Sequence, residues 1–202
     1  MLRLLIATTS PDKIAEIARV LAGLDLVIET LADHPGIEVP DETGPTFADN
    51  ARLKARHYAS ATGRLAVADD SGLEIDALGG APGVQSARFL SPDATYPERV
   101  AAILRRLDER PASDRTARFV AAVAVADDEQ IVFEATGRVD GRIADAARGT
   151  DGFGYDPIFF YPDYGRTLAE VTRDEKTAVS HRGQAFRKVR TFLEAHLRDP
   201  RR

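Results

Sequence analysis

Short apolar runs alternate with stretches of helical periodicity along the first third of this chain, and this alternation restricts the fold most strongly. The runs 2–8, 26–30 and 65–68 are each long enough for one buried strand. Between the first two, apolar residues recur at helical spacing and predict an amphipathic helix over 11–21. A second helix is expected after Thr46, with Phe47, Ala51, Ala55, Tyr58 and Ala59 on its buried side.

The rest of the chain adds strands and helices of other kinds. The runs 119–126 and 130–139 predict an antiparallel pair, and 95–107 an exposed helix. A closing helix is expected after the segment 180–183, with Phe186, Val189, Leu193 and Leu197 on its buried face. Interspersed strands and helices of this kind predict an α/β fold, a mixed sheet with helices on its faces.

Composition and charge exclude several classes of protein. The 202 residues are 44% hydrophobic, so residues 1–202 are expected to form a single domain with a sizeable core. The chain has no cysteine, which excludes disulfides and thiol catalysis and fits a cytoplasmic protein. A net charge of −5 argues against nucleic acid as a partner. The apolar N-terminus is too short for a membrane span and lacks the layout of a signal peptide, so no membrane is expected.

The start of the first helix predicts a phosphate site. Ser10 suits an N-cap and Pro11 the first helical position. A strand that leads into a helix N-terminus turns backbone N–H groups outward, and such groups can hold a phosphate. The Lys13 ammonium could pair with the same phosphate.

Carboxylates at the end of the third strand predict metal chemistry. Asp69 and Asp70 are adjacent there, and carboxylate oxygens bind Mg²⁺ well. Neighbours on an extended chain point in opposite directions, so one of the two would face a metal and the other would brace the loop. Glu42, in a polar loop, could be a second ligand or a general base. A structural Asp-Ser-Gly turn and a surface acid are the alternatives.

Three further groups of polar residues are candidates. Lys54 shares a helix face with Asn50, and a solvated face is an equally good interpretation. In the segment 153–157, an aromatic ring could stack on a base and Asp156 could accept from a ring N–H, although a packed turn would look the same. Arg182, beside His181, is a permanent donor for a carbonyl or phosphate. GxxxxGK[ST], GxGxxG and HExxH motifs are absent.

Five motifs in order resemble those of the inosine triphosphate pyrophosphatase family, which includes XTP/dITP diphosphatases. They are Thr46-Phe47 with Asn50-Ala51 and Lys54-Ala55; Ala68-Asp69-Asp70-Ser71-Gly72-Leu73; Gly79-Gly80-Ala81-Pro82-Gly83 with Ser86-Ala87-Arg88; Gly152-Phe153-Gly154-Tyr155-Asp156-Pro157-Ile158-Phe159; and Glu175-Lys176 with Ser180-His181-Arg182-Gly183. The resemblance runs from Leu5 to about Val189. It implies an elongated mixed sheet flanked by helices, two lobes with a central cleft, a homodimer, and Mg²⁺-dependent hydrolysis of non-standard purine nucleoside triphosphates.

The resemblance also implies a role for each motif. The catalytic carboxylate would be Asp70, with Glu42 and Asp70 as metal ligands. The implied substrate-binding residues are Thr8, Thr9, Ser10, Lys13, Lys54, Ser71, Phe153, Gly154, Tyr155, Asp156, Lys176, His181 and Arg182. Asparagine is usual in the family where this chain has Ser10, and small residues are usual where it has Pro11 and Asp12.

The reaction expected on this basis is attack of water between the α and β phosphates of ITP, dITP or XTP, giving a monophosphate and pyrophosphate. Two other functions stay open at this point. One is another metal-dependent nucleotide phosphohydrolase, against which the segments 153–156 and 180–183 argue. The other is a non-catalytic nucleotide sensor, which the altered turn at Ser10-Pro11-Asp12 would suit.

Overall fold

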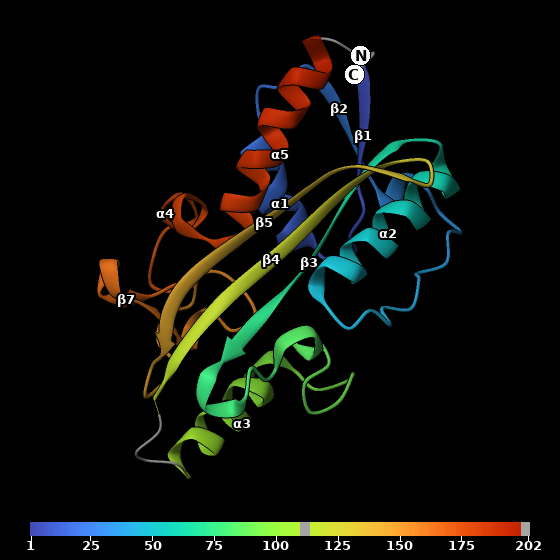
Figure 1. Cartoon of the computed structure of the whole chain (residues 1–202). Coiled ribbons are helices and arrows are strands. Elements are labelled where there is room, and N and C mark those ends of the chain that lie inside the picture. The colour runs from blue at the N-terminus through green and yellow to red at the C-terminus, as the bar shows by residue number, and fades with distance from the viewer. Residues whose placement is uncertain (110–113, 199–202) are drawn as a thin grey trace. The chain divides into compact units, whose positions relative to one another are not determined.

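The computed structural model describes residues 1–109 and 114–198 (Figure 1). Its strands are β1 (Leu2–Ile6), β2 (Leu26–Thr30), β3 (Leu65–Ile75), β4 (Thr116–Asp127), β5 (Gln130–Ile143), β6 (Phe159–Tyr161) and β7 (Arg166–Thr167). Its α-helices are α1 (Pro11–Leu21), α2 (Phe47–Thr62), α3 (Tyr96–Asp108), α4 (Arg173–Val179) and α5 (His181–Arg198). Within the described residues, no helix is both long and apolar enough to cross a membrane.

The strands hydrogen-bond in the order β2-β1-β3-β4-β5-β6-β7. β1 pairs in parallel with β2 and with β3, whereas β6 pairs antiparallel with β5 and β7. Mixed pairing with helices between the strands confirms the α/β fold that the sequence predicts. The bounds of α1 and β2 agree with those expected from the sequence.

The chain divides into two compact units. Unit 1 comprises residues 1–70, 121–137 and those from 181 onward, and unit 2 comprises 71–120 and 138–180. The long strands β3, β4 and β5 contribute residues to both units. The grouping of residues 1–202 as a single domain of two lobes stays a prediction.

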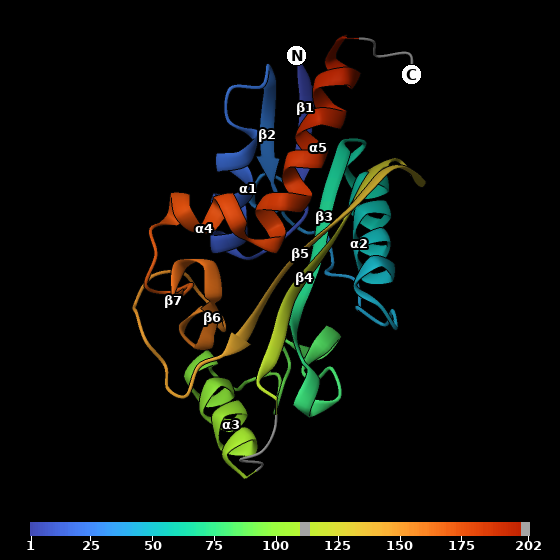
Figure 2. The same cartoon turned by 60° about the vertical axis from the view of Figure 1, so that its left-hand side comes forward.

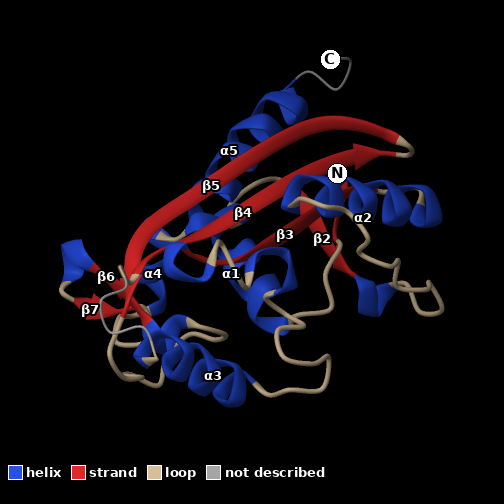
Figure 3. Cartoon of the chain, turned by 60° about the horizontal axis from the view of Figure 1, so that its bottom comes forward, coloured by secondary structure: helices blue, strands red, loops and turns tan. Residues whose placement is uncertain are grey.

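Unit 1 has helices on both faces of its part of the sheet. The chain runs from β1 outward to β2 and then back past β1 to β3, and right-handed crossovers in opposite directions place α1 and α2 on opposite faces. α5 packs against α1. Figures 2 and 3 show α5 and α2 on opposite sides of the strands. Residues that include Leu4, Ile17, Val123 and Phe186 form the buried core of this unit.

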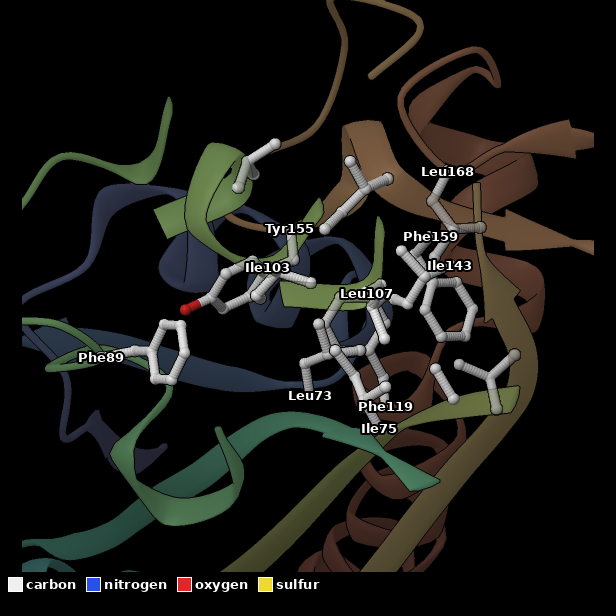
Figure 4. Close-up of a cluster of buried hydrophobic side chains, with 14 of the residues drawn as sticks. Leu73, Ile75, Phe89, Ile103, Leu107, Phe119, Ile143, Tyr155, Phe159 and Leu168 are labelled. Carbon is white, nitrogen blue, oxygen red and sulfur yellow. The ribbon is translucent and has the colours of Figure 1, made fainter. Parts of the chain in front are cut away.

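Unit 2 has its own hydrophobic core, with Leu73, Ile103, Tyr155 and Phe159 among its members (Figure 4). α3 starts at a capping box between Thr95 and Glu98 and contributes Val100, Ala102, Ile103 and Leu107 to the buried side chains. The sequence predicts an exposed helix over 95–107, but one face of α3 is buried. The apolar residues of α3 recur every three or four positions and face this core.

Two expectations about local structure are corrected. The segment Asp69-Asp70-Ser71-Gly72 is not a turn, because β3 continues through it to Ile75. The pairing of β3 with β1 ends at Val67, close to the end of the apolar run 65–68. The strand continues beyond that run, and its later residues Leu73 and Ile75 are buried. The segment that contains His181 and Arg182 does not precede the last helix, since α5 begins at His181 itself.

Candidate active site

In unit 1, the carboxyl ends of β1 and β2 lie level with Val67 of β3. Ile6 of β1 is paired with Thr30 of β2 on one side and with Val67 of β3 on the other. In the order β2-β1-β3, the direction in which strands are added reverses between β1 and β3. Ligands of open α/β sheets bind outside the carboxyl ends at such a switch point. The turn after β1 and the acids after Val67 both lie at this switch point.

Asp69 faces the side of the sheet that carries α1 and α5. Its Oδ2 atom lies 3.0 Å from the Lys13 Nζ and 3.1 Å from the Arg182 Nε. Glu16 of α1 holds the same guanidinium, with 2.6 Å between Arg182 Nη1 and Glu16 Oε2. Asp69 and Arg182 are 1% and 2% exposed, so charge pairing is what makes their burial tolerable.

Opposing effects set the pKa values of this cluster. Burial would raise the pKa of Asp69, but the Lys13 and Arg182 cations outweigh burial and hold that pKa far below its usual range. Burial, helped by the neighbouring Arg182 and Lys54 cations, lowers the pKa of Lys13 in spite of Asp69. Asp69 is therefore a permanent anion that braces two cations from two helices.

Asp70 faces the opposite side of β3, toward α2, as the alternation along a strand requires. Asn50 Nδ2 donates to Asp70 Oδ2 at 3.0 Å. The Lys54 Nζ lies 3.6 Å from Asp70 Oδ1 and 2.6 Å from Glu42 Oε1. Asn50 is fully buried and Lys54 is 9% exposed, so the alternative of a solvated face does not hold for this pair.

Asn50 also anchors the loop that carries Glu42. Its Oδ1 atom accepts from the Gly44 N–H at 2.7 Å, while its Nδ2 donates to Asp70. A Cβ at Gly44 would lie 2.7 Å from that same oxygen and 3.0 Å from the Asn50 backbone nitrogen. Glycine at this position therefore lets the loop approach α2 closely enough for Glu42 to reach Lys54.

Asp70 is the more basic of the two neighbouring acids. Burial raises the pKa of Asp70, and the Lys54 cation and the Asn50 hydrogen bond offset only part of that effect. Burial would lower the pKa of Lys54, but the carboxylates of Asp70, Asp69 and Glu42 outweigh it and raise that pKa. A carboxylate with a raised pKa is suited to accept a proton from water.

The turn between β1 and α1 has the predicted helix-start chemistry. Ser10 is the N-cap of α1 and accepts from the Lys13 N–H at 3.4 Å, and Pro11 is the first helical residue. Beside this turn unit 1 has a hollow of about 610 Å³, lined by Thr8 and Thr9 and, beyond β2, by residues such as Leu31 and His34. The helix N-terminus and the two threonines are the polar groups that an anion bound in this hollow would meet.

Unit 2 contains a second buried ion pair, between Asp156 and Lys176. The Lys176 Nζ lies 2.6 Å from Asp156 Oδ2, and the same oxygen accepts from the Phe153 N–H at 2.7 Å. Lys176 also lies over the Phe153 ring, 4.3 Å from its centroid. These contacts give the partly exposed Phe153 ring one orientation, as a stacking surface for a flat ligand requires.

Tyr155 has a structural environment in unit 2. Its side chain is buried in the core shown in Figure 4, and its hydroxyl donates to the Ser86 carbonyl at 2.8 Å. Burial raises the pKa of Tyr155. Any contact of Tyr155 with a ligand would therefore involve its backbone.

Glu42 and Asp70 fit a hard divalent cation by their chemistry. Both present carboxylate oxygens to one cationic group, the Lys54 ammonium, so they converge on a single position for positive charge. The described part of the chain contains no group of three or more His, Cys, Asp or Glu side chains that could hold a metal ion. Two carboxylates supply part of the oxygen shell of such a cation and leave its other positions open to other oxygen ligands.

Comparison with known proteins identifies the family. Residues 4–192 match the model of the Ham1 family. The chain belongs to the Ham1 family. It is 47% identical to a dITP/XTP pyrophosphatase of Yersinia pseudotuberculosis, over 98% of this chain and 100% of the relative. It is 45% identical to one from Exiguobacterium sp. (strain ATCC BAA-1283 / AT1b), over 93% of this chain and 95% of the relative. These matches confirm the resemblance drawn from the five motifs.

Solved Ham1 proteins have the same fold. The structure from Coxiella burnetii has a TM-score of 0.89 at 41% identity and covers 96% of this chain and 100% of its own. The Ham1 protein from Staphylococcus aureus has a TM-score of 0.85 at 34% identity, with 96% and 99% covered.

The structure gathers the predicted residues of this Ham1 chain into two groups. In unit 1, Lys13, Lys54, Glu42, Asp70 and Arg182 belong to linked charge clusters, with Thr8, Thr9 and Ser10 in the turn and the buried His181 at the start of α5. In unit 2, Phe153, Gly154, Tyr155, Asp156 and Lys176 form the second group, and Ser71 follows Asp70 in β3.

Two supporting residues of unit 1 were not among the predicted site residues. Asn50 bonds Asp70, and Glu16 bonds Arg182. Helical spacing could have indicated both, because Asn50 is four residues before Lys54 and Glu16 three residues after Lys13.

The first turns of α5 lie close to β5, where a Cβ at Gly137 would lie 2.8 Å from the Ala185 nitrogen.

Proposed function

We propose that this chain hydrolyses non-standard purine nucleoside triphosphates, with dITP and XTP as substrates, to the monophosphate and pyrophosphate. Sequence identities of 45% and 47% over nearly the whole chain, to Ham1 relatives named dITP/XTP pyrophosphatase, support this activity. One structural observation supports it most: Asp70 in the middle of β3, Lys54 and the partly exposed Glu42 form a charge cluster beside the buried Asn50. Such a cluster has the acids and the cation that an anhydride hydrolysis needs.

Asp70 is the proposed general base. The raised pKa of Asp70 increases its affinity for the proton of an attacking water. Asn50 donates to one oxygen of this carboxylate and orients it, and Lys54 lies 3.6 Å from the other oxygen in the absence of substrate. Water attacks the α phosphorus, the bond between that phosphorus and the α–β bridging oxygen breaks, and pyrophosphate leaves.

The chain's own cations stabilise the charge that builds up on the leaving group. Lys13 and the N-terminal turn of α1 lie on the side of β3 that Asp69 faces, and Lys54 lies on the side of Asp70. Preorganised cations of this kind cost no reorganisation during the reaction. Asp69 holds Lys13 and Arg182 and is assigned no contact with metal.

A divalent cation, for which we propose Mg²⁺, would be held by Glu42 and Asp70. When bound it supplies positive charge to the phosphates. The hard oxygen donors of both carboxylates are the support for this assignment.

Contacts to the base are assigned separately to residues of each motif group. We assign Phe153 to stacking, with Gly154, Asp156 and Lys176 beside it, as the contacts within unit 2 support. His181 and Arg182 are the proposed donors for the C6 carbonyl, and Asp69 with Glu16 orients the Arg182 guanidinium. Adenine has an amino group at C6, and an unmatched buried polar group costs about 1–3 kcal/mol, or about 5- to 150-fold in selectivity.

Homodimer formation and a cytoplasmic location remain predictions. Size-exclusion chromatography with light scattering tests the first of these, and cell fractionation tests the second.

Pyrophosphate release from dITP, XTP, ITP, GTP and ATP, with and without Mg²⁺, tests the proposed function. We expect dITP, XTP and ITP to exceed GTP and ATP clearly in kcat/KM, and turnover to need the metal. Equal kcat/KM for ITP and ATP would contradict the reading of the base. Phosphate rather than pyrophosphate as the product would contradict the proposed reaction.

A further inference from the structure

Lys54 occupies a position between the two proposed metal ligands. Its Nζ lies 2.6 Å from Glu42 Oε1 and 3.6 Å from Asp70 Oδ1. The other oxygen of Asp70 is used by Asn50 at 3.0 Å, so Oδ1 is the one that faces Lys54. Glu42, Asp70 and Lys54 have side-chain exposures of 27%, 10% and 11%, so solvent screens this charge cluster only in part.

We propose that the Lys54 ammonium competes with the divalent cation for Glu42 and Asp70, and that the substrate's triphosphate relieves this competition by drawing the ammonium to itself. The inference rests on the proposed function in one respect, since it takes Glu42 and Asp70 as the metal-binding pair. Besides contacting phosphate, Lys54 would weaken the binding of the metal ion until the nucleotide is bound.

Electrostatics gives the direction of the effect. The buried Asp70 carboxylate and the partly exposed Glu42 carboxylate repel each other, and the Lys54 ammonium beside both offsets this repulsion. A divalent cation that approaches the same oxygens is repelled by the ammonium beside it. A triphosphate carries more negative charge than either carboxylate and attracts the ammonium more strongly. The flexible four-carbon side chain of lysine allows the ammonium to move to the triphosphate.

Lys54 is the cation suited to this exchange in unit 1. Lys13 pairs with Asp69, which faces the opposite side of β3 from Asp70. Lys54 is the cation that lies beside both Glu42 and Asp70. The consequence is that metal and nucleotide bind cooperatively, because each removes an obstacle to the other.

Titration of the full chain with Mn²⁺ in the absence of nucleotide tests the competition. Lys54→Met and Lys54→Gln remove the charge, and both should bind Mn²⁺ about 10- to 100-fold more tightly than the wild type, as loss of a neighbouring unit charge predicts. Lys188→Met is the matched control, because Lys188 donates to the Thr136 carbonyl and is not part of the cluster. It should leave Mn²⁺ affinity unchanged, and thermal melts establish that each variant is folded.

A second readout uses the dITP analogue with a methylene bridge between the α and β phosphates. This analogue should tighten Mn²⁺ binding by a larger factor in the wild type than in Lys54→Met, since only the wild type has an ammonium to displace. In the wild-type protein, Mg²⁺ should shift the side-chain NMR signals of Lys54, which keeps the proposal testable if both variants fail to fold.

Mn²⁺ affinity in a folded Lys54→Met that equals or falls below that of the wild type would overturn the proposal, as would an unshifted Lys54 signal at saturating Mg²⁺. Pyrophosphate release from dITP by the wild type separates the two hypotheses. If that release occurs while Lys54→Met binds Mn²⁺ no more tightly, the competition is wrong and the function stands. If Lys54→Met binds Mn²⁺ more tightly but the wild type releases no pyrophosphate, the function is wrong and the competition stands.

Discussion

The pKa values of the neighbouring acids Asp69 and Asp70 in β3 shift in opposite directions because their surroundings differ. Asp69 contacts two cations, which hold its pKa far below the usual range, whereas burial raises the pKa of Asp70. Strand geometry accounts for this separation, since consecutive side chains point to opposite faces and so meet different helices. At the scale of single residues, one sequence motif thus contains a carboxylate held as an anion and a carboxylate that binds a proton more readily.

Asp70→Asn should lower kcat by about 10²- to 10⁴-fold, because an amide cannot accept the proton of the attacking water. The near-isosteric change should leave the thermal melt close to that of the wild type. Pyrophosphate release measures the loss. Asp25→Asn is the control, because Asp25 is an exposed acid away from the site. Near wild-type kcat in Asp70→Asn would remove Asp70 from its catalytic role.

Asn50→Ala should affect both stability and turnover. It leaves the Gly44 N–H without its side-chain acceptor and Asp70 without its amide donor, and one unsatisfied buried group costs about 1–3 kcal/mol of unfolding free energy. Release of the Glu42 loop and of Asp70 should lower kcat more than it raises KM. Urea unfolding and steady-state kinetics measure the two effects. A variant that loses stability but keeps kcat would limit Asn50 to a structural role.

At the scale of elements, the parallel part of unit 1 is tied together through one glutamate. Glu29 of β2 accepts hydrogen bonds from Arg3 of β1 and from Arg64, which precedes β3. Its Oε2 atom also lies 2.8 Å from the His34 Nε2. Hydrogen bonds from Arg3 and His34 are the main reason that the pKa of Glu29 is lowered to about 2. A single carboxylate therefore links the starts and ends of neighbouring strands.

The lowered pKa of Glu29 predicts how stability depends on pH. The folded state binds the proton more weakly than the unfolded chain, so this contribution is fully present above the unfolded pKa of about 4.5 and is lost as pH falls toward 2. Urea unfolding at several pH values should show wild type more stable than Glu29→Gln at pH 7. The difference should shrink between about pH 4.5 and pH 2. A difference that stays constant over this range would contradict the ion pairing.

At the scale of the whole molecule, each unit has a hydrophobic core of its own. Phe186 of α5 is fully buried in unit 1, and Phe159 of β6 is fully buried in unit 2. Each core draws side chains from segments far apart in the sequence. We therefore expect both cores to be essential to the native state.

Phe186→Ala and Phe159→Ala should each lower the free energy of unfolding by about 3–5 kcal/mol, since each leaves a cavity in a close-packed core. Val132→Ala is the control, because Val132 is 37% exposed, and it should change stability by less than about 0.5 kcal/mol. Urea unfolding measures all three. If either phenylalanine variant matched the control, that core would not be required for folding.

Local signals in the sequence were enough to determine α1, its Ser10 cap, β2 and the alternation of Asp69 and Asp70, because these depend on residues within a few positions of one another. The burial of Asn50 and Lys54 was not determined in this way, since a polar helix face looks the same whether water or Asp70 lies beside it. The family motifs indicated most of the site residues, yet not which residues they contact.

Tertiary structure alone decided which residues pair. Arg182 reaches Asp69 across 113 residues and Lys176 reaches Asp156 across 20, and such pairs depend on how helices pack on the sheet. Spacing along the chain carries little information about these pairs, because their members lie on different elements. Burial of a charged side chain costs free energy unless folding brings an opposite charge to it. The sequence by itself therefore determined the elements and the kind of chemistry, and packing determined which carboxylate has a lowered pKa and which a raised one.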